Sequence, residues 1–347
     1  MVITKLDINN FRNLNLKFEP QAGFNLILGK NGTGKSNFLD SIYHLSLAKS
    51  FKPYTLKNNV NFEKPEFAVI EANIEEDDIQ KALKIVFATS PEIEYEKKRL
   101  FVNTKATIRA KFINNISVIL FAPHNTNLLT SSPDIRRLEL DDFASSFDFK
   151  YALTLNEYKE LIKTRNSLLR ALSEGNGGAD QLDYWDSKLV QLGAKLIIER
   201  KNLIERLNPI MNAKAKSKFN EKLNNLEIVY ITKFNSENPK KEFEEKIKEN
   251  RYKEIAAGQT LYGPHKDDFM ILNNEKDLKL FGSRGQQRIS TLLFKLSMWQ
   301  YIFDSKGIKP IILLDDAMAE LDDENKISLE KIIEELDTQT FIATTHI

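Results

Sequence analysis

Hydrophobic residues follow two different patterns along the chain. Near both ends, short apolar runs bounded by polar turns predict β-strands. Between about residues 132 and 207, apolar residues recur at spacings of three and four, which predicts long helices. Two architectures therefore share one chain. The expected strands are Met1–Phe11, Phe24–Leu28, Phe67–Ala72, Leu83–Ala88, Ser117–Phe121, Leu226–Tyr230 and Ile311–Leu314, and the expected helices are Asn37–Leu47, Tyr151–Leu172, Gln181–Leu207 and Ile289–Phe303.

Length and composition narrow the possible classes of protein. A chain of 347 residues suggests about two domains. Its 50 Lys and Arg against 49 Asp and Glu leave a net charge of +1, so any nucleic-acid contact must use a local patch. The lack of cysteine excludes disulfides and thiolate nucleophiles, and the four scattered histidines form no metal-binding cluster. Without a signal peptide or a long apolar run, we expect a cytoplasmic protein that does not bind a membrane.

A nucleotide-binding motif follows the strand expected at Phe24–Leu28. Residues 29–36 are Gly-Lys-Asn-Gly-Thr-Gly-Lys-Ser, and a helical run follows them, which is the context that a P-loop requires. The glycines let successive N–H groups face a phosphate, and the helix N-terminus adds its positive dipole end. We expect Lys35 to reach the β- and γ-phosphates and Ser36 to supply a hydroxyl ligand to Mg²⁺. A glycine-rich turn without a ligand is the alternative.

A second candidate site ends an entirely apolar run. Residues 311–314 are Ile-Ile-Leu-Leu, and Asp315 and Asp316 follow them. Such a strand is typical of a parallel sheet buried on both faces, and the carboxyl end of such a sheet binds ligands. We expect Asp315 to hold Mg²⁺ directly or through water, and Asp316 to polarise the attacking water. An ordinary strand-to-helix boundary has the same pattern, but the P-loop favours the functional interpretation.

A third segment indicates which class of P-loop protein this is. Residues 283–288, Ser-Arg-Gly-Gln-Gln-Arg, open the helical run Ile289–Phe303. A serine cap with free N–H groups behind it is an anion site, although for the segment in isolation an ordinary helix cap is the favoured explanation. Five segments occur in the order that is typical of the ABC-type ATPases. They are the P-loop, this segment, the aspartate pair, residues 319–322 (Ala-Glu-Leu-Asp) and residues 344–346 (Thr-Thr-His).

Over nearly its whole length the sequence resembles the RecF family of bacterial recombination mediators, which belongs with the SMC and Rad50 heads. The resemblance implies an α/β fold, in which an ABC-type P-loop ATPase head with mixed β-sheets carries an inserted, mainly helical lobe without a long coiled coil. We assign residues 1–125 and 255–347 to the head and residues 126–254 to the helical arm lobe. The matching segments are Asn10–Asn13, Ser50–Lys52, Leu120–Pro123, Ser132–Arg137 and Gly263–Phe269.

The resemblance also implies a mechanism in which ATP joins two chains head to head. Ser283 and the helix behind it would cap the γ-phosphate of the partner's nucleotide, and slow hydrolysis would loosen the dimer. The dimer would bind duplex or gapped DNA, show weak DNA-stimulated ATPase activity, help to load recombinase at single-strand gaps, and have RecR and RecO as partners. The implied ligands of ATP and Mg²⁺ are Arg12, Gly29, Lys30, Asn31, Gly32, Thr33, Gly34, Lys35, Ser36, Asn37, Ser283, Gly285, Gln286 and Asp315, with Asp315, Asp316 and His346 in catalysis.

Three departures from the family pattern bear on this site. Ala319 stands where a serine is usual, so one hydrogen bond across the dimer is missing. His124 and Asn125 replace an acidic pair, which removes any metal or water contact made there. Asp316 is one methylene shorter than the glutamate of most ABC-type enzymes, and we therefore expect slow turnover.

A basic segment is the candidate for DNA contact. Lys195–Lys222 holds eight basic and three acidic residues, a local charge of +5. It suits sequence-independent contact with the DNA backbone, and a solvated helical face is an equal alternative. We expect Arg136 and Arg137 to brace the lobe interface rather than to contact bases. His44 is expected in the core or on the surface, and His265 in a structural hydrogen bond near the nucleotide, with catalysis as its alternative role.

Three rival classes differ from this interpretation in their motifs. In an SMC or Rad50 protein, hundreds of residues of heptads would separate the P-loop from the Ser283 segment, whereas 246 residues lie between Ser36 and Ser283. An ABC importer subunit would be shorter between motifs and would carry Leu-Ser-Gly-Gly-Gln. A small-molecule P-loop kinase would need no such helix. Stimulation of phosphate release by duplex DNA, rather than by a small acceptor, distinguishes a DNA switch from a kinase.

Overall fold

The computed structural model describes residues 1–61, 63, 66–77, 79–90, 95–123, 127–218, 223, 225–235, 237–316 and 323–345. The chain forms two compact units. Unit 1 comprises residues 1–127, 213–223 and 283–347, and unit 2 comprises residues 128–212 and 224–282. Among the described residues, no helix combines the length and the apolar character that a membrane crossing requires.

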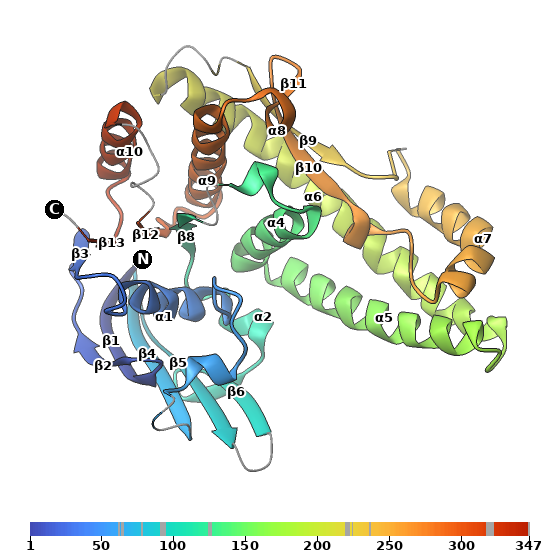
Figure 1. The fold of residues 1–347 in the computed structure, drawn as a ribbon, viewed down its shortest axis with the longest axis horizontal. Helices are drawn as coiled ribbons and strands as arrows, with labels where there is room; N and C mark the ends of the chain where they lie inside the picture. Colours follow the sequence, from blue (N-terminus) through green and yellow to red (C-terminus); the bar gives the residue numbers. More distant parts are fainter. Residues whose placement is uncertain are drawn as a thin grey trace. The chain divides into compact units, whose positions relative to one another are not determined.

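Unit 1 opens with a six-stranded antiparallel sheet in the order β2-β1-β4-β5-β6-β7 (Figure 1). Along β4 every second side chain is buried, including Ala68, Ile70, Ala72 and Ile74, because alternate residues of a strand face opposite sides of the sheet. The strands are β1 (Val2–Phe11), β2 (Leu14–Phe18), β4 (Phe67–Glu76), β5 (Ile79–Ser90), β6 (Tyr95–Val102) and β7 (Lys105–Thr107).

The second sheet of unit 1 is parallel and has the order β3-β13-β12-β8. Every residue of β12 is buried, as the apolar run before the aspartate pair predicts. Because β3, β13 and β12 all run parallel, the loops that follow β3 and β12 leave the same edge of the sheet. The strands are β3 (Phe24–Leu28), β8 (Val118–Phe121), β12 (Ile311–Asp315) and β13 (Thr340–Thr344).

Helix α1 (Lys35–Leu47) lies between these two sheets (Figure 1). It contacts β4 and β5 of the antiparallel sheet and β8, β12 and β13 of the parallel sheet. Because both sides of α1 are covered, it is buried nearly all round, with Phe38, Leu39, Ile42 and Leu45 among its core residues. Helices α9 (Arg284–Lys306) and α10 (Asp323–Leu336) lie on the other side of the parallel sheet. A short helix, α2 (Arg109–Phe112), follows β7.

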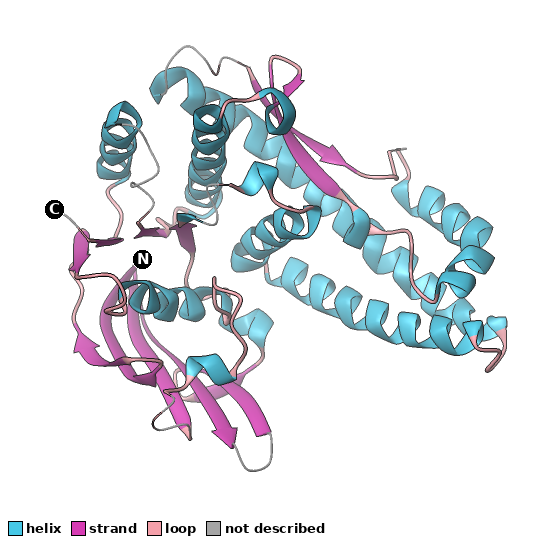
Figure 2. Cartoon of the chain, viewed as in Figure 1, coloured by secondary structure: helices cyan, strands magenta, loops and turns pink. Residues whose placement is uncertain are grey.

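Unit 2 is mainly helical and carries a small antiparallel sheet in the order β11-β10-β9 (Figure 2). The predicted long helices are present as α5, which extends beyond both predicted ends, and α6, which begins one residue later than predicted and continues to Lys218. The last residues of α6 are counted with unit 1. The elements are α4 (Pro133–Phe147), α5 (Phe149–Ser173), α6 (Leu182–Lys218), β9 (Leu226–Ile231), α7 (Pro239–Ala257), β10 (Asp268–Asn273), β11 (Lys276–Asp277) and α8 (Leu278–Phe281).

The division of the chain differs from the predicted one over residues 213–223, which were assigned to the arm lobe but belong to unit 1, and at its second boundary. We assigned residues 255–347 to the head, whereas residues 255–282 belong to unit 2. The reason is strand pairing, because β10 pairs along its whole length with β9 of the same unit. Ion pairs reinforce this arrangement, since Arg136 of α4 bonds Asp268 at the start of β10. The first boundary lies close to the predicted one.

A buried ion cluster joins α5, α6 and α7 within unit 2. Arg165 is fully buried, and its guanidinium donates to Asp186 at 2.9 Å, to Glu254 at 2.6 Å and to Thr260 at 2.8 Å. Glu254 is fully buried as well. Buried charges of this kind are tolerated only when their partners neutralise and hydrogen-bond them.

We predict that Arg165→Met lowers the unfolding free energy of unit 2 by about 3 to 5 kcal/mol, because Glu254 would stay buried without its cation. Urea unfolding followed by Trp185 fluorescence in a Trp299→Phe background measures the unfolding free energy of unit 2, since the two tryptophans lie in different units. Lys163→Ala is the matched control on the same helix, because its ion pair with Glu160 is solvent-exposed. Equal stability of the Arg165 variant and this control would contradict the assigned role of the cluster.

Candidate nucleotide site

The P-loop of unit 1 connects β3 to α1 as the motif predicts. Residues Lys30 to Thr33 form its exposed crown, and Gly34 at φ +105° is the N-cap of α1. A Cβ atom at Gly34 would approach the Asn13 side chain to 2.9 Å, so this position requires glycine for both conformation and space. The α1 N-terminus has no side-chain cap, which leaves its N–H groups facing the loop. This geometry suits an anion.

Lys35 is buried at the base of the loop. Its ammonium group donates to the carbonyl oxygens of Gly29 at 2.8 Å and Lys30 at 3.1 Å. The carbonyl of Lys30 also accepts from the Thr33 hydroxyl at 2.9 Å. These bonds hold one positive charge inside the curve of the loop, where the phosphates of a nucleotide would lie.

Ser36 and Asp315 are in direct contact although 279 residues separate them. The Ser36 hydroxyl donates to Asp315 Oδ1 at 2.8 Å. Both are hard oxygen donors of the kind that Mg²⁺ prefers, and a Mg²⁺ site completes its octahedron with phosphate oxygens and water. Among the described residues no cluster of three or more His, Cys, Asp or Glu side chains could hold a metal ion without such help. The two predicted metal ligands are therefore brought together and fit Mg²⁺.

The Asp315 carboxyl has a raised pKa. Burial raises the pKa of the Asp315 carboxyl, whereas the hydrogen bond from Ser36 and the charge of Lys52 act in the opposite direction. Asp316 follows at φ +48°, and its backbone N–H donates to the Ala343 carbonyl at 3.1 Å. This left-handed conformation turns the chain sharply at the end of β12 and fixes the position of Asp316 beside Asp315.

The Ser283 segment forms the first turn of α9. Ser283 Oγ accepts from the Gln286 N–H at 3.2 Å, and Gln286 Oε1 accepts from the Ser283 N–H at 2.9 Å. This capping box ties together two of the residues predicted to bind nucleotide. Ser283, Arg284 and Gly285 are exposed, so the helix N-terminus is open to an approaching group.

Arg12 and Asn37, the remaining predicted nucleotide ligands, lie beside the loop. Arg12 is buried and donates to Asn37 Oδ1 at 2.9 Å and to Asp40 Oδ2 at 2.5 Å. Its guanidinium is thus engaged with protein groups of unit 1. His346 was also predicted in catalysis, and it lies outside the described residues together with His124, Asn125 and Ala319.

Other predicted residues have structural roles in unit 2. His265 is buried and uses both ring nitrogens, with Tyr158 Oη at 2.7 Å and the Thr260 carbonyl at 3.1 Å, and burial lowers its pKa to about 4. Arg136 bonds Asp268, and Arg137 bonds the Asp267 carbonyl, so both arginines connect α4 to the start of β10.

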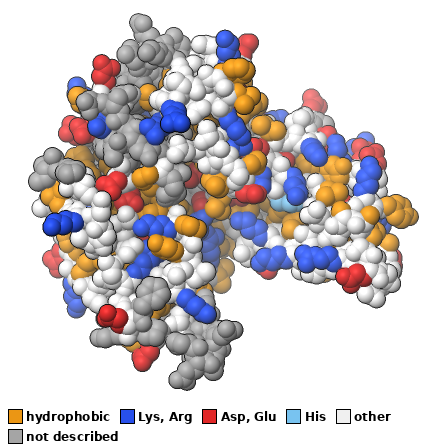
Figure 3. Space-filling model, viewed as in Figure 1, with side chains coloured by type: hydrophobic (Ala, Val, Ile, Leu, Met, Phe, Trp, Pro, Cys, Tyr) orange, Lys and Arg blue, Asp and Glu red, His pale blue; other side chains and the backbone are white. Residues whose placement is uncertain are grey.

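The basic segment loses one member as a DNA contact. Arg200 is buried and pairs with Asp141, so it cannot face DNA. Lys201 and Lys216 are exposed. Figure 3 shows Lys and Arg side chains interspersed with Asp and Glu on the face that it draws, rather than gathered in one block.

Comparison with known proteins agrees with this geometry. Residues 2–346 match the family described as the RecF/RecN/SMC N terminal domain. The DNA replication and repair protein RecF of Natranaerobius thermophilus is 31% identical over 99% of this chain and 91% of its own length. RecF of Caldanaerobacter subterraneus is 33% identical over 99% of this chain and 94% of its own length.

The chain belongs to the RecF family. Two solved structures of the recombination mediator protein RecF in the RecFOR pathway, one designated RecF-ATP and one RecF-ATPrS, resemble this chain over 99% and 100% of its length. Their TM-scores are 0.90 and 0.89 and their identities 30% and 31%, and this chain covers 92% and 93% of theirs. The predicted family and fold class are thereby confirmed: an α/β head with two sheets and an inserted, mainly helical unit.

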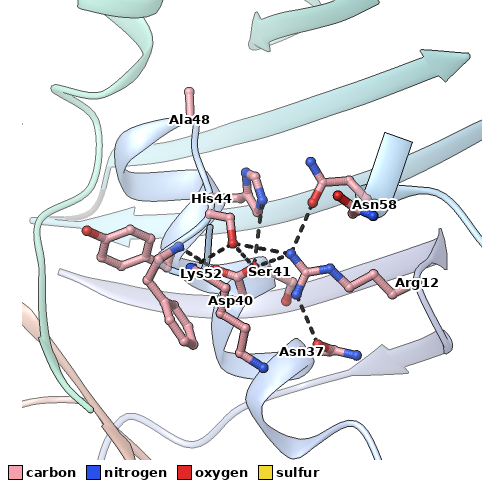
Figure 4. A network of polar contacts seen from close by, with 12 residues as sticks. Arg12, Asn37, Asp40, Ser41, His44, Ala48, Lys52 and Asn58 are labelled. Atoms are coloured by element: carbon pink, nitrogen blue, oxygen red, sulfur yellow. Dashed lines mark hydrogen bonds and ion pairs between the residues drawn. The ribbon is translucent and has the colours of Figure 1, made fainter. Parts of the chain in front are cut away.

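Several residues that hold this site of the RecF-family chain together were not predicted to do so. Asp40, Asn13 and Asn59 make side-chain hydrogen bonds around Arg12 or the P-loop. Figure 4 shows Asp40 facing Arg12. Asp40 could have been noticed, because a carboxylate among Phe38, Leu39 and Ile42 interrupts an apolar helix and needs a partner. Asn13 lies in the matching segment Asn10–Asn13, although no role was predicted for it, and Asn59 carries no comparable signal.

We predict that His44 makes the protein sensitive to acid. His44 is buried between Phe11 and Phe87, and burial lowers its pKa from 6.5 to about 4. The unfolded chain therefore takes up this proton at a higher pH than the folded chain does. The stability that depends on the neutral His44 ring is complete above the unfolded pKa of 6.5 and is lost as the pH falls toward 4. Replacing the ring by Phe should reduce the loss of unfolding free energy between about pH 7.5 and pH 5 by about 2 kcal/mol.

Urea unfolding followed by Trp299 fluorescence in a Trp185→Phe background measures this difference, since Trp299 lies in the same unit as His44. A His265→Phe variant is the control, because it removes a histidine of similar pKa from unit 2. Parallel pH curves for the parent and His44→Phe would show that His44 takes up its proton in the folded state.

Proposed function

We propose that the chain is an ATP-dependent DNA-binding protein of recombinational repair and replication restart, in which ATP acts as a switch. The single observation that carries the ATP part is the direct contact of Ser36 with Asp315 beside a P-loop whose Lys35 faces inward. The DNA part rests on the family, whose relatives are named as DNA replication and repair proteins.

The residues of the site divide into distinct roles. The P-loop N–H groups and Lys35 bind the β- and γ-phosphates, and Ser36 and Asp315 hold Mg²⁺. Mg²⁺, when bound, neutralises charge on the phosphate oxygens. Asp316 orients the attacking water from its fixed turn after β12. Because its side chain is short, hydrolysis is slow, which suits a switch better than a motor.

Assembly of two chains completes the site. The exposed first turn of α9 offers N–H groups, and the Ser283 hydroxyl keeps its proton to donate, because the capping box uses only its oxygen as an acceptor. This turn caps the γ-phosphate of ATP bound to the partner chain. DNA binds the ATP-bound dimer by sequence-independent backbone contact, and RecR and RecO are its partners in loading recombinase at gaps.

We predict that Ser283→Arg separates ATP binding from dimerisation. The variant should bind ATP with nearly parental affinity, since the P-loop is unchanged, yet form no ATP-dependent dimer. Light scattering at several concentrations with a non-hydrolysable ATP analogue and Mg²⁺ measures assembly, and equilibrium titration measures affinity. Lys35→Ala is the paired control and should lose tight ATP binding itself.

If Ser283→Arg forms the dimer as fully as the parent, the γ-phosphate-capping role of Ser283 is contradicted. Ser283 would then be only a helix cap that contributes about 1 kcal/mol to stability. Parental ATP affinity in Lys35→Ala would remove the nucleotide site altogether. If the parent protein stays monomeric with the analogue, the switch itself is wrong.

We predict that Asp316→Asn slows ATP hydrolysis by at least about a hundredfold while ATP binding and the dimer persist. Asparagine suits the comparison, because it tolerates the positive φ at this position as aspartate does. Phosphate release, with and without gapped duplex DNA, measures hydrolysis, and retention of labelled DNA should last longer in the variant. Parental turnover in Asp316→Asn would remove Asp316 from its catalytic role.

A further inference from the structure

A buried carboxylate lies on α1, one turn beyond Ser36, and none of the roles described above uses it. Asp40 is fully buried, and each of its oxygens is occupied. Oδ2 accepts from Arg12 Nη2 at 2.5 Å and from the Ser50 hydroxyl at 2.7 Å, and Oδ1 accepts from the Phe51 N–H at 2.9 Å. Asp40 therefore ties α1 to two other segments of unit 1 (Figure 4).

Arg12 is the most constrained of these partners. Besides Asp40, it donates to Asn37 Oδ1 at 2.9 Å and to Asn59 Oδ1 at 3.0 Å. Its guanidinium carbon lies 4.7 Å from the Phe11 ring centroid and 4.4 Å from that of Tyr54. We call Arg12, Asn37, Asp40, Ser50 and Asn59 the Asp40 cluster.

The Asp40 cluster reaches the P-loop through two amide side chains. Asn37 Nδ2 donates to Asn13 Oδ1 at 2.8 Å, and Asn13 Nδ2 donates to the Thr33 carbonyl at 3.3 Å. Asn13 is also the side chain that packs closely against Gly34. A chain of hydrogen bonds thus runs from the buried carboxylate to the backbone of the loop.

A second branch of the Asp40 cluster leads to the segment that follows α1. The Ser50 hydroxyl accepts from the Lys52 N–H at 2.9 Å, which fixes the backbone of Lys52. Asp40 is therefore connected to the P-loop through one branch and to the segment of Ser50 and Lys52 through the other.

We propose that Asp40 is a positioning residue for nucleotide binding: it holds Arg12 as an internal brace of the P-loop, and Arg12 stays in the Asp40 cluster when nucleotide binds. This inference rests on the proposed nucleotide site and differs from the expectation that Arg12 is itself a ligand of the phosphates. If Arg12 left the cluster, a fully buried carboxylate would lose its cation, and such a loss is costly.

The two roles for Arg12 make opposite predictions for ADP. The brace shapes the part of the P-loop that binds the β-phosphate, which ATP and ADP share. A direct ligand of the γ-phosphate would affect ATP alone. Removing the Asp40 carboxylate would also act differently in the two cases. If Arg12 is a brace, Asp40→Asn weakens it and nucleotide binding falls, whereas if Arg12 is a phosphate ligand, Asp40→Asn frees it to bind the nucleotide.

Equilibrium titration of ATP and ADP with Mg²⁺ tests the proposal on the full chain. We expect Asp40→Asn to weaken both nucleotides by about tenfold, with their affinity ratio unchanged. Asn13→Ala should do the same, and because Asn13 is exposed, this variant keeps the test valid if Asp40→Asn does not fold. Ser41→Ala is the matched control, because its hydroxyl bonds only the Phe38 carbonyl of its own helix.

Four outcomes decide the matter. The brace is supported if Asp40→Asn and Asn13→Ala weaken the binding of ATP and of ADP equally, while Ser41→Ala binds both nucleotides like the parent protein. Unchanged or tighter ATP binding in Asp40→Asn overturns it. So does a loss confined to ATP in Arg12→Gln. Lys35→Ala separates this failure from a failure of the site itself, since parental nucleotide affinity in that variant would overturn the proposed function rather than the brace alone.

Discussion

The contact between Ser36 and Asp315 is the constraint on which unit 1 depends. For a hydroxyl at the start of α1 to meet a carboxylate at the end of β12, β3 and β12 must run parallel with β13 between them. Helix α1 must then cross beneath the sheet, where the antiparallel sheet covers its other side. The P-loop conformation, the burial of Lys35 and the turn at Asp316 all follow from this arrangement.

Buried charge is treated alike in both units. Asp40 in unit 1 and Arg165 and Arg200 in unit 2 are each almost inaccessible to solvent and each surrounded by partners from distant segments. Such clusters contribute little net stability compared with apolar packing, but breaking one leaves an uncompensated charge. They therefore favour one arrangement of helices over its alternatives, which matters for a site built from separated segments.

The sequence predicts those parts whose physics is local. The P-loop, β12 and α9 follow from glycine positions, an unbroken apolar run and a serine cap, and the structure contains all three. Helix α7 was missed because Phe243 and Ile247 are its only buried apolar residues, too few for a periodic signal. The second domain boundary and the partners of Asp40 depend on pairing between segments far apart in sequence, which no local pattern records.

The strand order of the parallel sheet has a consequence for synthesis of the protein. The only neighbour that β3 has among the described strands is β13, and more than 300 residues of chain lie between them. At about 5 to 20 residues per second, the ribosome needs about 15 to 60 seconds to make that interval. During this time the phosphate-binding strand has no partner, while β1, β4 and β5 can already pair. The nascent chain must therefore keep an apolar segment from aggregating until β13 has been made.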